Sequence, residues 1–484
     1  MQKKDFTYPG LYRYFEEFSA VPRPSFHEEQ AVAYLAAFAR ERGLPFYTDE
    51  HRNCLIEKAA TPGREGEPAL LLQGHVDMVC EKNEGVEHDF LREPLSLYEK
   101  DGWLRAQGTT LGADDGVAVA TMLYVLDGGV SSHPPLQCLF TASEEVGLEG
   151  AKGFDYSRIH AASLINMDSA DESCVIAGCA GGERCDLRVR CQAHPVMGIP
   201  VTLRIGGLAG GHSGENIHCG RANANKLLGG ILLSLSGDYE FSLVSLRGGS
   251  KDNAIPREAV ASLIVEKAEG LAPALETLRT RIAGTLSPED AGFRLEWEIG
   301  SGSVAAKAAP RQVTGNIIFL LSTVENGVLA QDFHGAPGAV EFSRNLGVME
   351  TTGAGEELIF DFTFSSRSTM EWRLDASARQ LEEYGRMTGA ECRLYNRYPG
   401  WEFQKESPIR ERYIRAYREL FGKPVKVEII HAGLECGIIH EKLPELDILS
   451  CGPVVTDLHS PDEALDLASF ARFFTVIKRI LEGE

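Results

Sequence analysis

Two adjacent carboxylates, Asp114 and Asp115, lie between Gly112 and Gly116, directly before an apolar run at residues 117–126 that predicts a helix. A carboxylate on a tight turn ahead of a helix can project into a cleft, because glycine places few steric limits on the backbone. Asp and Gly are also ordinary turn residues, so a purely structural turn is the alternative. The chemical interpretation therefore depends on polar residues elsewhere in the chain.

Other polar groups follow apolar runs that predict strands. Residues 69–79 contain His75 and Asp77, residues 135–143 lead into Glu144 and Glu145, and residues 162–168 end on Asp168. Continuous apolar runs favour strands buried on both faces, as in a parallel sheet. In open α/β sheets, ligands bind at the carboxyl ends of the strands. The repeated pattern predicts one polar site at that edge; for any single fragment, a solvated loop or a structural histidine is the alternative.

The spacing of His75 and Asp77 places both side chains on one side of an extended backbone. An imidazole and a carboxylate so placed suit a metal ligand and the partner that orients its ring. The neighbouring pair Glu144 and Glu145 allows one metal ligand and one free base, although the residues alone do not say which is which.

Length and composition limit the classes of protein to consider. The 484 residues exceed the usual size of one hydrophobic core and predict two or three domains. A formal net charge of −22 argues against a nucleic acid or an anionic membrane as partner. We find no run of eighteen apolar residues, as a membrane span would need, and no secretory signal at the N-terminus. Eleven scattered cysteines without a Cys-x-x-Cys pair argue against a disulfide framework and favour a reducing cytoplasm.

The order of predicted elements indicates an α/β domain in two parts, interrupted by an α+β domain. Residues 1–184 and 401–484 alternate helices with apolar strands, whereas residues 185–400 contain strands of alternating polarity together with helices. Such strands are typical of a half-exposed sheet, and helices on one face would complete an α+β layer.

Two helix starts are predicted from local signals. Ser25 and Glu28 have the spacing of a capping box ahead of a helix at residues 31–40. Pro461 suits the first turn of a helix that continues to about residue 481.

The separated motifs, taken together and in this order, resemble those of the co-catalytic dinuclear zinc peptidases of the carboxypeptidase and aminoacylase type. The motifs are His75 with Asp77, Gly112–Gly116, the pair Glu144 and Glu145, Asp168, and His459. The longer strings at residues 74–79, 108–114 and 431–437 are similar to the aminoacyl-histidine dipeptidase, or bacterial carnosinase-like, branch. The resemblance covers nearly the whole chain. It implies a mixed-sheet zinc-exopeptidase catalytic domain interrupted by an α+β lid domain.

The resemblance also implies a role for each polar residue of the first and last segments. His75 and Asp168 would bind one metal ion, Glu145 and His459 the other, Asp114 would bridge the two, Asp77 would hold the ring of His75, and Glu144 would be the general base. Imidazole and carboxylate ligands suit two Zn²⁺ ions, with Co²⁺ or Mn²⁺ as alternatives. Two metals about 3.5–4 Å apart can clamp a hydroxide and polarise a carbonyl. A nearby carboxylate can carry the water proton to the leaving amine.

Further residues are implied to contact the substrate. In the middle domain these are His212, which would stabilise the oxyanion, together with Asn253 and Arg367; in the last segment they are His431 and Glu435. The guanidinium of Arg367 matches the geometry of a substrate carboxylate. The alternatives are a polar turn residue for His212, a solvated arginine for Arg367 and a structural histidine for His431.

Two positions depart from the expected motifs. Asp115 stands where we expect asparagine in many close relatives, and it is not expected to bind metal. Ala432 stands where we expect glycine, and it would narrow or reshape the substrate pocket.

The predicted function is that of a metal-dependent dipeptidase, which removes an amino acid, often histidine, from an aminoacyl group with a free amine. We expect a cytoplasmic homodimer formed through the lid domain, with small peptides as substrates. An N-acyl amino acid deacylase or another exopeptidase with the same metal chemistry is the alternative. A non-catalytic metal-binding scaffold would be expected to lose Glu144 or a ligand, and all are present. Signatures of zincins, serine hydrolases and phosphate-loop enzymes are missing from the sequence.

Overall fold

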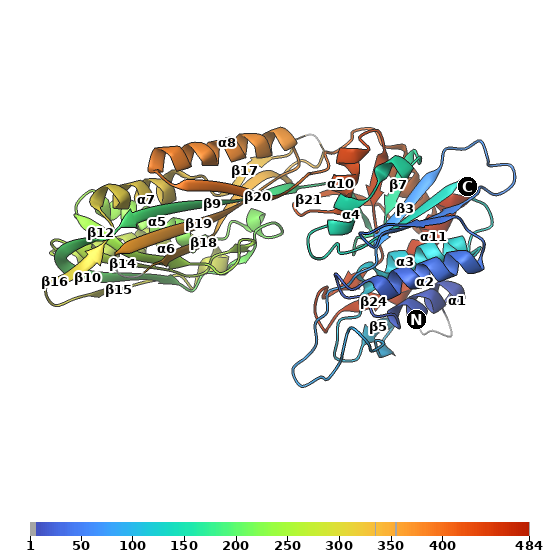
Figure 1. Cartoon of the computed structure of the whole chain (residues 1–484), viewed down its shortest axis with the longest axis horizontal. Helices are drawn as coiled ribbons and strands as arrows, with labels where there is room; N and C mark the ends of the chain where they lie inside the picture. Colours follow the sequence, from blue (N-terminus) through green and yellow to red (C-terminus); the bar gives the residue numbers. More distant parts are fainter. Residues whose placement is uncertain (1–5, 334, 354–355, 484) are drawn as a thin grey trace. The chain divides into compact units, whose positions relative to one another are not determined.

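The computed structural model describes residues 6–333, 335–353 and 356–483. These residues form two compact units (Figure 1). Unit 1 comprises the described parts of 1–179, 401–429 and 434–484, and unit 2 those of 180–400 and 430–433. The sequence placed the boundaries at 184/185 and 400/401. That unit 2 acts as a lid and as a dimerisation domain stays a prediction.

Unit 1 is built on an eight-stranded sheet in the order β1-β2-β6-β3-β7-β22-β8-β21. The strands are β1 (Phe46–Thr48), β2 (Cys54–Lys58), β3 (Leu70–His75), β6 (Leu136–Thr141), β7 (Ser163–Asn166), β8 (Cys174–Cys179), β21 (Lys426–Ile430) and β22 (Asp447–Ser450). The central strands β6, β3, β7 and β22 are parallel, whereas β1, β2 and β8 pair antiparallel. All residues of β3 and β6 are buried, as the continuous apolar runs predicted. The expected α/β class with a mixed sheet is confirmed.

Helices cover this sheet and form the main core of unit 1. They are α1 (Pro9–Ser19), α2 (Glu29–Glu41), α3 (Ala113–Leu126), α4 (Glu149–Gly153), α9 (Pro408–Phe421), α10 (Glu435–Lys442) and α11 (Leu467–Glu482). α3 is apolar almost all round and nearly fully buried, because it contacts both α1 and β3 (Figure 1). A smaller sheet contains β4 (Leu97–Lys100), β5 (Trp103–Ala106), β23 (Val455–Thr456) and β24 (Ala464–Asp466).

The predicted capping box at Ser25 and Glu28 is wrong. Helix α2 begins at Glu29, so Glu28 occupies the N-cap position and makes no side-chain capping bond. The Ser25 hydroxyl instead donates to Asp77 Oδ2 at 2.7 Å. Tertiary contact with a buried carboxylate has therefore replaced the local bond that the spacing suggested.

The predicted helix start at Pro461 is also wrong. Residues 461–462 form a turn, β24 follows, and α11 begins only at Leu467. The carboxylate of Asp466 accepts hydrogen bonds from the backbone N–H groups of Ala468 and Ser469, which makes it the N-cap.

Unit 2 contains a ten-stranded antiparallel sheet whose main path is β15-β10-β14-β12-β18-β19-β9-β20. Its strands are β9 (Gly181–Gln192), β10 (His194–Gly206), β12 (Phe241–Gly248), β14 (Ala259–Val265), β15 (Arg294–Ile299), β16 (Val304–Ala308), β17 (Gly327–Gln331), β18 (Val340–Thr352), β19 (Glu357–Ser368) and β20 (Glu391–Tyr398). A separate short pair joins β11 (Gly211–His212) to β13 (Ala254–Ile255).

The helices of unit 2 are α5 (Ala224–Ser236), α6 (Leu271–Ala283), α7 (Arg311–Thr323) and α8 (Glu371–Thr388). α5 contacts β10, β12, β14 and β18, and α8 contacts β9, β19 and β20, so these helices lie on the sheet as an α+β layer requires (Figure 1). Within the described ranges, no helix has the length and apolar character needed to cross a membrane.

Leu72 offers a test of the parallel core, because it is fully buried in β3 within the hydrophobic cluster of unit 1. We predict that Leu72→Ala lowers the free energy of unfolding by about 2–5 kcal/mol, measured by urea denaturation at an unchanged slope. Leu91→Ala is the control, since Leu91 is 46% exposed and should change the free energy by less than about 0.5 kcal/mol. Equal effects of the two substitutions would contradict this placement of the core.

Candidate metal centre and substrate-binding residues

The predicted polar groups of unit 1 gather at the carboxyl-terminal edge of its parallel strands. His75 is the last residue of β3 and lies opposite Thr141, the last residue of β6. Glu144 and Glu145 follow shortly after the end of β6, and Asp168 follows shortly after the end of β7. Since β6, β3 and β7 are parallel neighbours, their carboxyl ends bring these side chains to one place.

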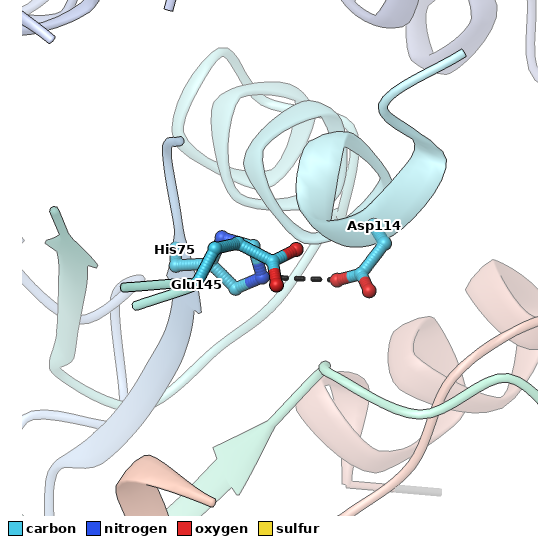
Figure 2. A group of neighbouring side chains, drawn as sticks. All are labelled: His75, Asp114 and Glu145. Carbon is cyan, nitrogen blue, oxygen red and sulfur yellow. Dashed lines mark hydrogen bonds and ion pairs between the residues drawn. The ribbon is translucent and has the colours of Figure 1, made fainter. Parts of the chain in front are cut away.

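Asp114 enters the same place from the start of α3 and lies between two imidazoles. Its Oδ1 is 2.9 Å from Nε2 of His75, and its Oδ2 is 3.3 Å from Nε2 of His459. Oε1 of Glu145 lies 3.1 Å from the same nitrogen of His459. Figure 2 shows the His75 ring facing the Asp114 carboxylate, with Glu145 beside them. One potential ligand atom from each of His75, Asp114 and Glu145 lies within 4.8 Å of the others.

A second group of potential ligands shares His75 with the first. It consists of His75, Asp115 and Asp168, whose ligand atoms also lie within 4.8 Å of one another. Asp115 is buried and accepts hydrogen bonds from the backbone N–H groups of His75 and Ala118, both at 3.3 Å. Asp115, which the sequence did not mark as a ligand, therefore belongs to this group together with Asp168. The peptide bond between Asp114 and Asp115 is cis.

Negative charge is crowded in this part of unit 1. Burial, together with the charge of Asp114, raises the pKa of Asp168 to about 8. Burial likewise raises the pKa of Glu144 well above its usual value, with added repulsion from Asp168 and Glu145. Hydrogen bonds to Asp114 and Glu145 raise the pKa of His459 to about 10. Because these carboxylates repel one another, bound cations would relieve the repulsion, and the donor set of imidazole and carboxylate fits divalent metal ions.

Asp77 is fully buried and joins the His75 ring to the glutamate pair. Its Oδ1 lies 3.3 Å from Nδ1 of His75 and accepts a hydrogen bond from the backbone N–H of Glu144 at 3.0 Å. Its Oδ2 accepts from the backbone N–H of Glu145 and from the Ser25 hydroxyl. The carboxylate can therefore fix the orientation of the imidazole and of the loop that carries both glutamates.

Three supporting residues had no predicted role or a wrong one. Ser25 was assigned to a helix cap, whereas Arg23 and Glu463 were not singled out at all. Both are buried beside the ligand loops. The only signal in the sequence was the position of Glu463, four residues after His459.

Glu435 lies in unit 1 at the start of α10 and is fully buried. Its Oε2 accepts hydrogen bonds from Nε2 of Gln73 at 2.5 Å and from the hydroxyl of Thr141 at 2.6 Å. Among the described residues, its Oε1 has no hydrogen-bond partner. Gln73 and His75 project to the same face of β3, so Glu435 is next to the ligand group. Burial raises its pKa to about 7.

Arg367 in unit 2 is 6% exposed, so the alternative of a solvated arginine is wrong. Its Nη1 donates to the hydroxyl of Tyr398 at 2.8 Å. Within the part of the chain that the structure describes, its Nε has no acceptor and no carboxylate forms an ion pair with it. A buried cation without a counter-ion is costly, which makes this guanidinium a natural partner for an anion.

Two histidines lie close to this guanidinium. Burial, together with the charge of Arg367, lowers the pKa of His431 to about 3. Its Nε2 lies 2.7 Å from the Ser343 hydroxyl. Burial and Arg367 also lower the pKa of His212. Nδ1 of His212 accepts a hydrogen bond from the backbone N–H of Glu215, so its neutral ring carries the proton on Nε2. That N–H is a donor of the kind that an oxyanion needs.

Asn253 is placed beside His212 by the short strand pair. The residue after it, Ala254, lies opposite His212 in β11 and β13, and the backbone oxygen of Asn253 accepts from the N–H of Ser213 at 2.8 Å. A Cβ atom on Gly214 would lie 2.5 Å from the backbone oxygen of His431, so this glycine permits the close approach of the two histidine segments. Unit 2 thus contains the three residues predicted there and also His431, which the sequence had placed in the last segment.

Comparison with known proteins identifies the family. Residues 71–483 match Peptidase family M20/M25/M40. The chain is 36% identical over 476 residues to the cytosol non-specific dipeptidase of Escherichia coli (strain K12), covering 98% of this chain and 97% of that protein. It superposes on the crystal structure of aminoacylhistidine dipeptidase from Vibrio alginolyticus with a TM-score of 0.89 and 32% identity, covering 100% and 98% of the two chains.

A tripeptidase from Staphylococcus aureus gives a TM-score of 0.60 at 15% identity, over 99% of this chain and 98% of that one, which is a likeness of fold alone. The family match covers most of the chain, and the E. coli relative spans nearly all of it. The chain therefore belongs to Peptidase family M20/M25/M40.

Proposed function

We propose that this peptidase is a metal-dependent dipeptidase that hydrolyses aminoacyl-histidine and related dipeptides. The observation that carries the proposal is the position of Asp114, whose two carboxylate oxygens lie 2.9 and 3.3 Å from the imidazoles of His75 and His459. A carboxylate between two imidazoles, with further carboxylates around it, suits a pair of ions. The names of the E. coli and Vibrio relatives support the choice of a dipeptide substrate.

The proposed ligands divide between two divalent ions, most simply Zn²⁺, with Co²⁺ or Mn²⁺ as alternatives. His75 and Asp168 would bind one ion, Glu145 and His459 would bind the other, and Asp114 would be shared between them. When bound, such a pair of ions polarises the scissile carbonyl and activates water. The short distance from Glu145 to His459 and the grouping of Asp168 with His75 support this division.

The protein's own groups then complete the reaction. Asp77 holds the His75 ring and the backbone of both glutamates, so that ligand and base keep a fixed spacing. Glu144 lies next to the ligand Glu145 but outside both ligand groups, which leaves its carboxylate free to take a proton from the attacking water. It then passes that proton to the leaving amine. Nε2–H of His212 donates to the oxyanion that forms on the former carbonyl.

Each unit contains one charged group that, by itself, suits one end of a dipeptide with both termini free. Arg367 lacks a carboxylate partner among the described residues and would bind the terminal carboxylate, assisted by Asn253 and the neutral His431. The unpartnered oxygen of Glu435 would accept from the substrate's ammonium group. An N-acyl amino acid deacylase is the second candidate, since its substrates also carry a carboxylate, but they offer no ammonium for Glu435.

We also propose that the chain works as a cytoplasmic homodimer formed through unit 2. The name of the E. coli relative, a cytosol dipeptidase, and the scattered cysteines support the compartment. The dimer rests on the resemblance of the middle domain to the lid domain of dimeric relatives.

The reaction is tested with metal-stripped protein reloaded with zinc. We predict that stripping abolishes hydrolysis of β-alanyl-histidine and alanyl-histidine, that zinc restores it, and that Glu144→Ala lowers kcat by at least about a hundredfold because the proton carrier is lost. Metal content must stay unchanged in Glu144→Ala, since Glu144 is not a proposed ligand. Cleavage of N-acetyl-histidine alone would favour the deacylase. Metal-independent cleavage would contradict the proposal.

The role of Arg367 is tested by comparing free and amidated dipeptides. Arg367→Met removes a charge-assisted bond, so kcat/KM for alanyl-histidine should fall about 10- to 150-fold, mainly through KM, whereas alanyl-histidine amide should be affected little. Arg190→Met is the control, because the Arg190 side chain is 44% exposed on the same unit. If kcat/KM falls by the same factor for alanyl-histidine and for its amide, Arg367 does not bind the substrate's terminal carboxylate.

The neutral state of His431 can be measured directly. Its pKa of about 3, against an ordinary 6.5, means that its ring resonances should not shift between about pH 8 and about pH 5 in an NMR titration of labelled histidine. The His431→Gln variant assigns the signals by their loss. Because the folded pKa is lowered, protonation opposes folding, and this histidine makes unfolding easier as the pH falls below its ordinary value. A titration midpoint of the His431 resonances near the ordinary histidine pKa would show that the ring is not buried beside Arg367.

A further inference from the structure

Glu463 is 2% exposed, and its carboxylate accepts four backbone hydrogen bonds from the turn that carries Asp114. Oε2 accepts from the N–H groups of Leu111 at 2.8 Å and Gly112 at 2.9 Å. Oε1 accepts from those of Ala113 at 2.8 Å and Asp114 at 3.3 Å. One side chain therefore satisfies four consecutive backbone donors at and just before the start of α3. Bonds of this kind to an ionised acceptor are the strong ones.

Arg23 is 1% exposed and holds the same turn from the other side. Its Nη2 donates to the backbone oxygen of Gly112 at 2.5 Å, and its Nη1 donates to those of Val76 and Asp77 at 3.0 Å. Gly112 has a φ of +65°, and a Cβ atom there would lie 2.4 Å from Nη2 of Arg23. Glycine at this position therefore provides the room that the guanidinium occupies.

The opposite charges of Glu463 and Arg23 attract each other. The attraction of Glu463 is the strongest electrostatic contribution that keeps Arg23 charged, against a burial that lowers its pKa. Through backbone bonds they connect the segment after His75, the turn of Asp114 and, because Glu463 is four residues after His459, the loop of His459. Neither side chain is among the proposed ligands.

We infer that Glu463 and Arg23 are positioning residues that hold the ligand loops in register, so that Asp114 stays between His75 and His459 before any ion binds. This inference rests on the ligand roles proposed above. Both residues act through the backbone of the turn, and the ions themselves are contacted by other side chains. The consequence is a prearranged site, which spares ion binding the cost of ordering three separate loops.

A purely structural role is the competing explanation, because loss of any buried charge destabilises a fold. Glu172 provides a matched control. It is 7% exposed in unit 1 and is four residues after the proposed ligand Asp168, but its carboxylate bonds to Ser469 and Arg472 of α11 rather than to a ligand loop. Glu172→Gln should therefore lower stability without disturbing the ligands.

The experiment is a competition between metal-free protein and a zinc chelator, combined with thermal unfolding of the same samples. We expect Glu463→Gln, which keeps only one acceptor oxygen, to weaken zinc binding by about 10- to 100-fold. Glu172→Gln should bind zinc as the unsubstituted chain does, with a comparable fall in Tm. Saturating zinc should restore hydrolysis in Glu463→Gln but not in Glu144→Ala, because Glu463 touches no reacting atom.

Arg23 supplies a second pair of variants in case Glu463→Gln folds poorly. Arg23→Lys keeps the charge and part of the bonding, so it should weaken zinc binding less than Arg23→Met. Equal zinc affinity in Glu463→Gln, Arg23→Met and the unsubstituted chain would overturn the inference. So would equal weakening in Glu172→Gln and Glu463→Gln.

The His459→Ala variant separates failure of this inference from failure of the proposed function. If His459→Ala weakens zinc binding and Glu463→Gln does not, the assignment of His459 as a ligand is supported and the positioning role of Glu463 is contradicted. If the unsubstituted chain binds no zinc, or if His459→Ala leaves zinc binding unchanged, the ligand assignment is contradicted. The positioning role, which rests on that assignment, is then contradicted as well.

Discussion

Repulsion among closely spaced carboxylates, buried or partly buried, is the constraint on which the rest of unit 1 depends. Asp114, Asp115, Glu144, Glu145 and Asp168 converge at one edge of a sheet whose strands are buried on both faces. Such a cluster raises the pKa of several members and opposes folding unless cations or hydrogen-bond donors offset the charge. Two imidazoles, a set of backbone N–H groups and the guanidinium of Arg23 provide part of that compensation. Divalent ions would provide the remainder, so the same crowding that costs stability creates affinity for metal.

The periodicity of the chain predicted the fold of unit 1 well and that of unit 2 less completely. Parallel strands buried on both faces leave long apolar runs, and β3, β6 and β7 lie within the runs predicted for them. In unit 2, β12 and β18 and the helices α7 and α8 had not been identified. Strand β18 contains Arg344 and Asn345 in fully buried positions, so its polarity does not alternate as a half-exposed strand should.

The candidate site was predictable where residue type and order along the chain carry the information, as with His75 and Asp168. It was not predictable where contacts join distant segments. Glu463 bonds to backbone N–H groups about 350 positions earlier in the chain, and no local pattern marks such a partner. Ser25 shows the same limit, since its spacing from Glu28 fitted a helix cap, whereas its hydroxyl donates a hydrogen bond to Asp77. The orphaned oxygen of Glu435 likewise becomes visible only when burial is known.

A crystal structure of the zinc-loaded protein, with anomalous scattering recorded at the zinc edge, would test the central claim most directly. The account predicts two peaks about 3.5–4 Å apart, with one oxygen of Asp114 bound to each ion. His75 and Asp168 should contact one ion, and Glu145 and His459 the other. A single peak, or two peaks of which only one is bound by Asp114, would contradict the account.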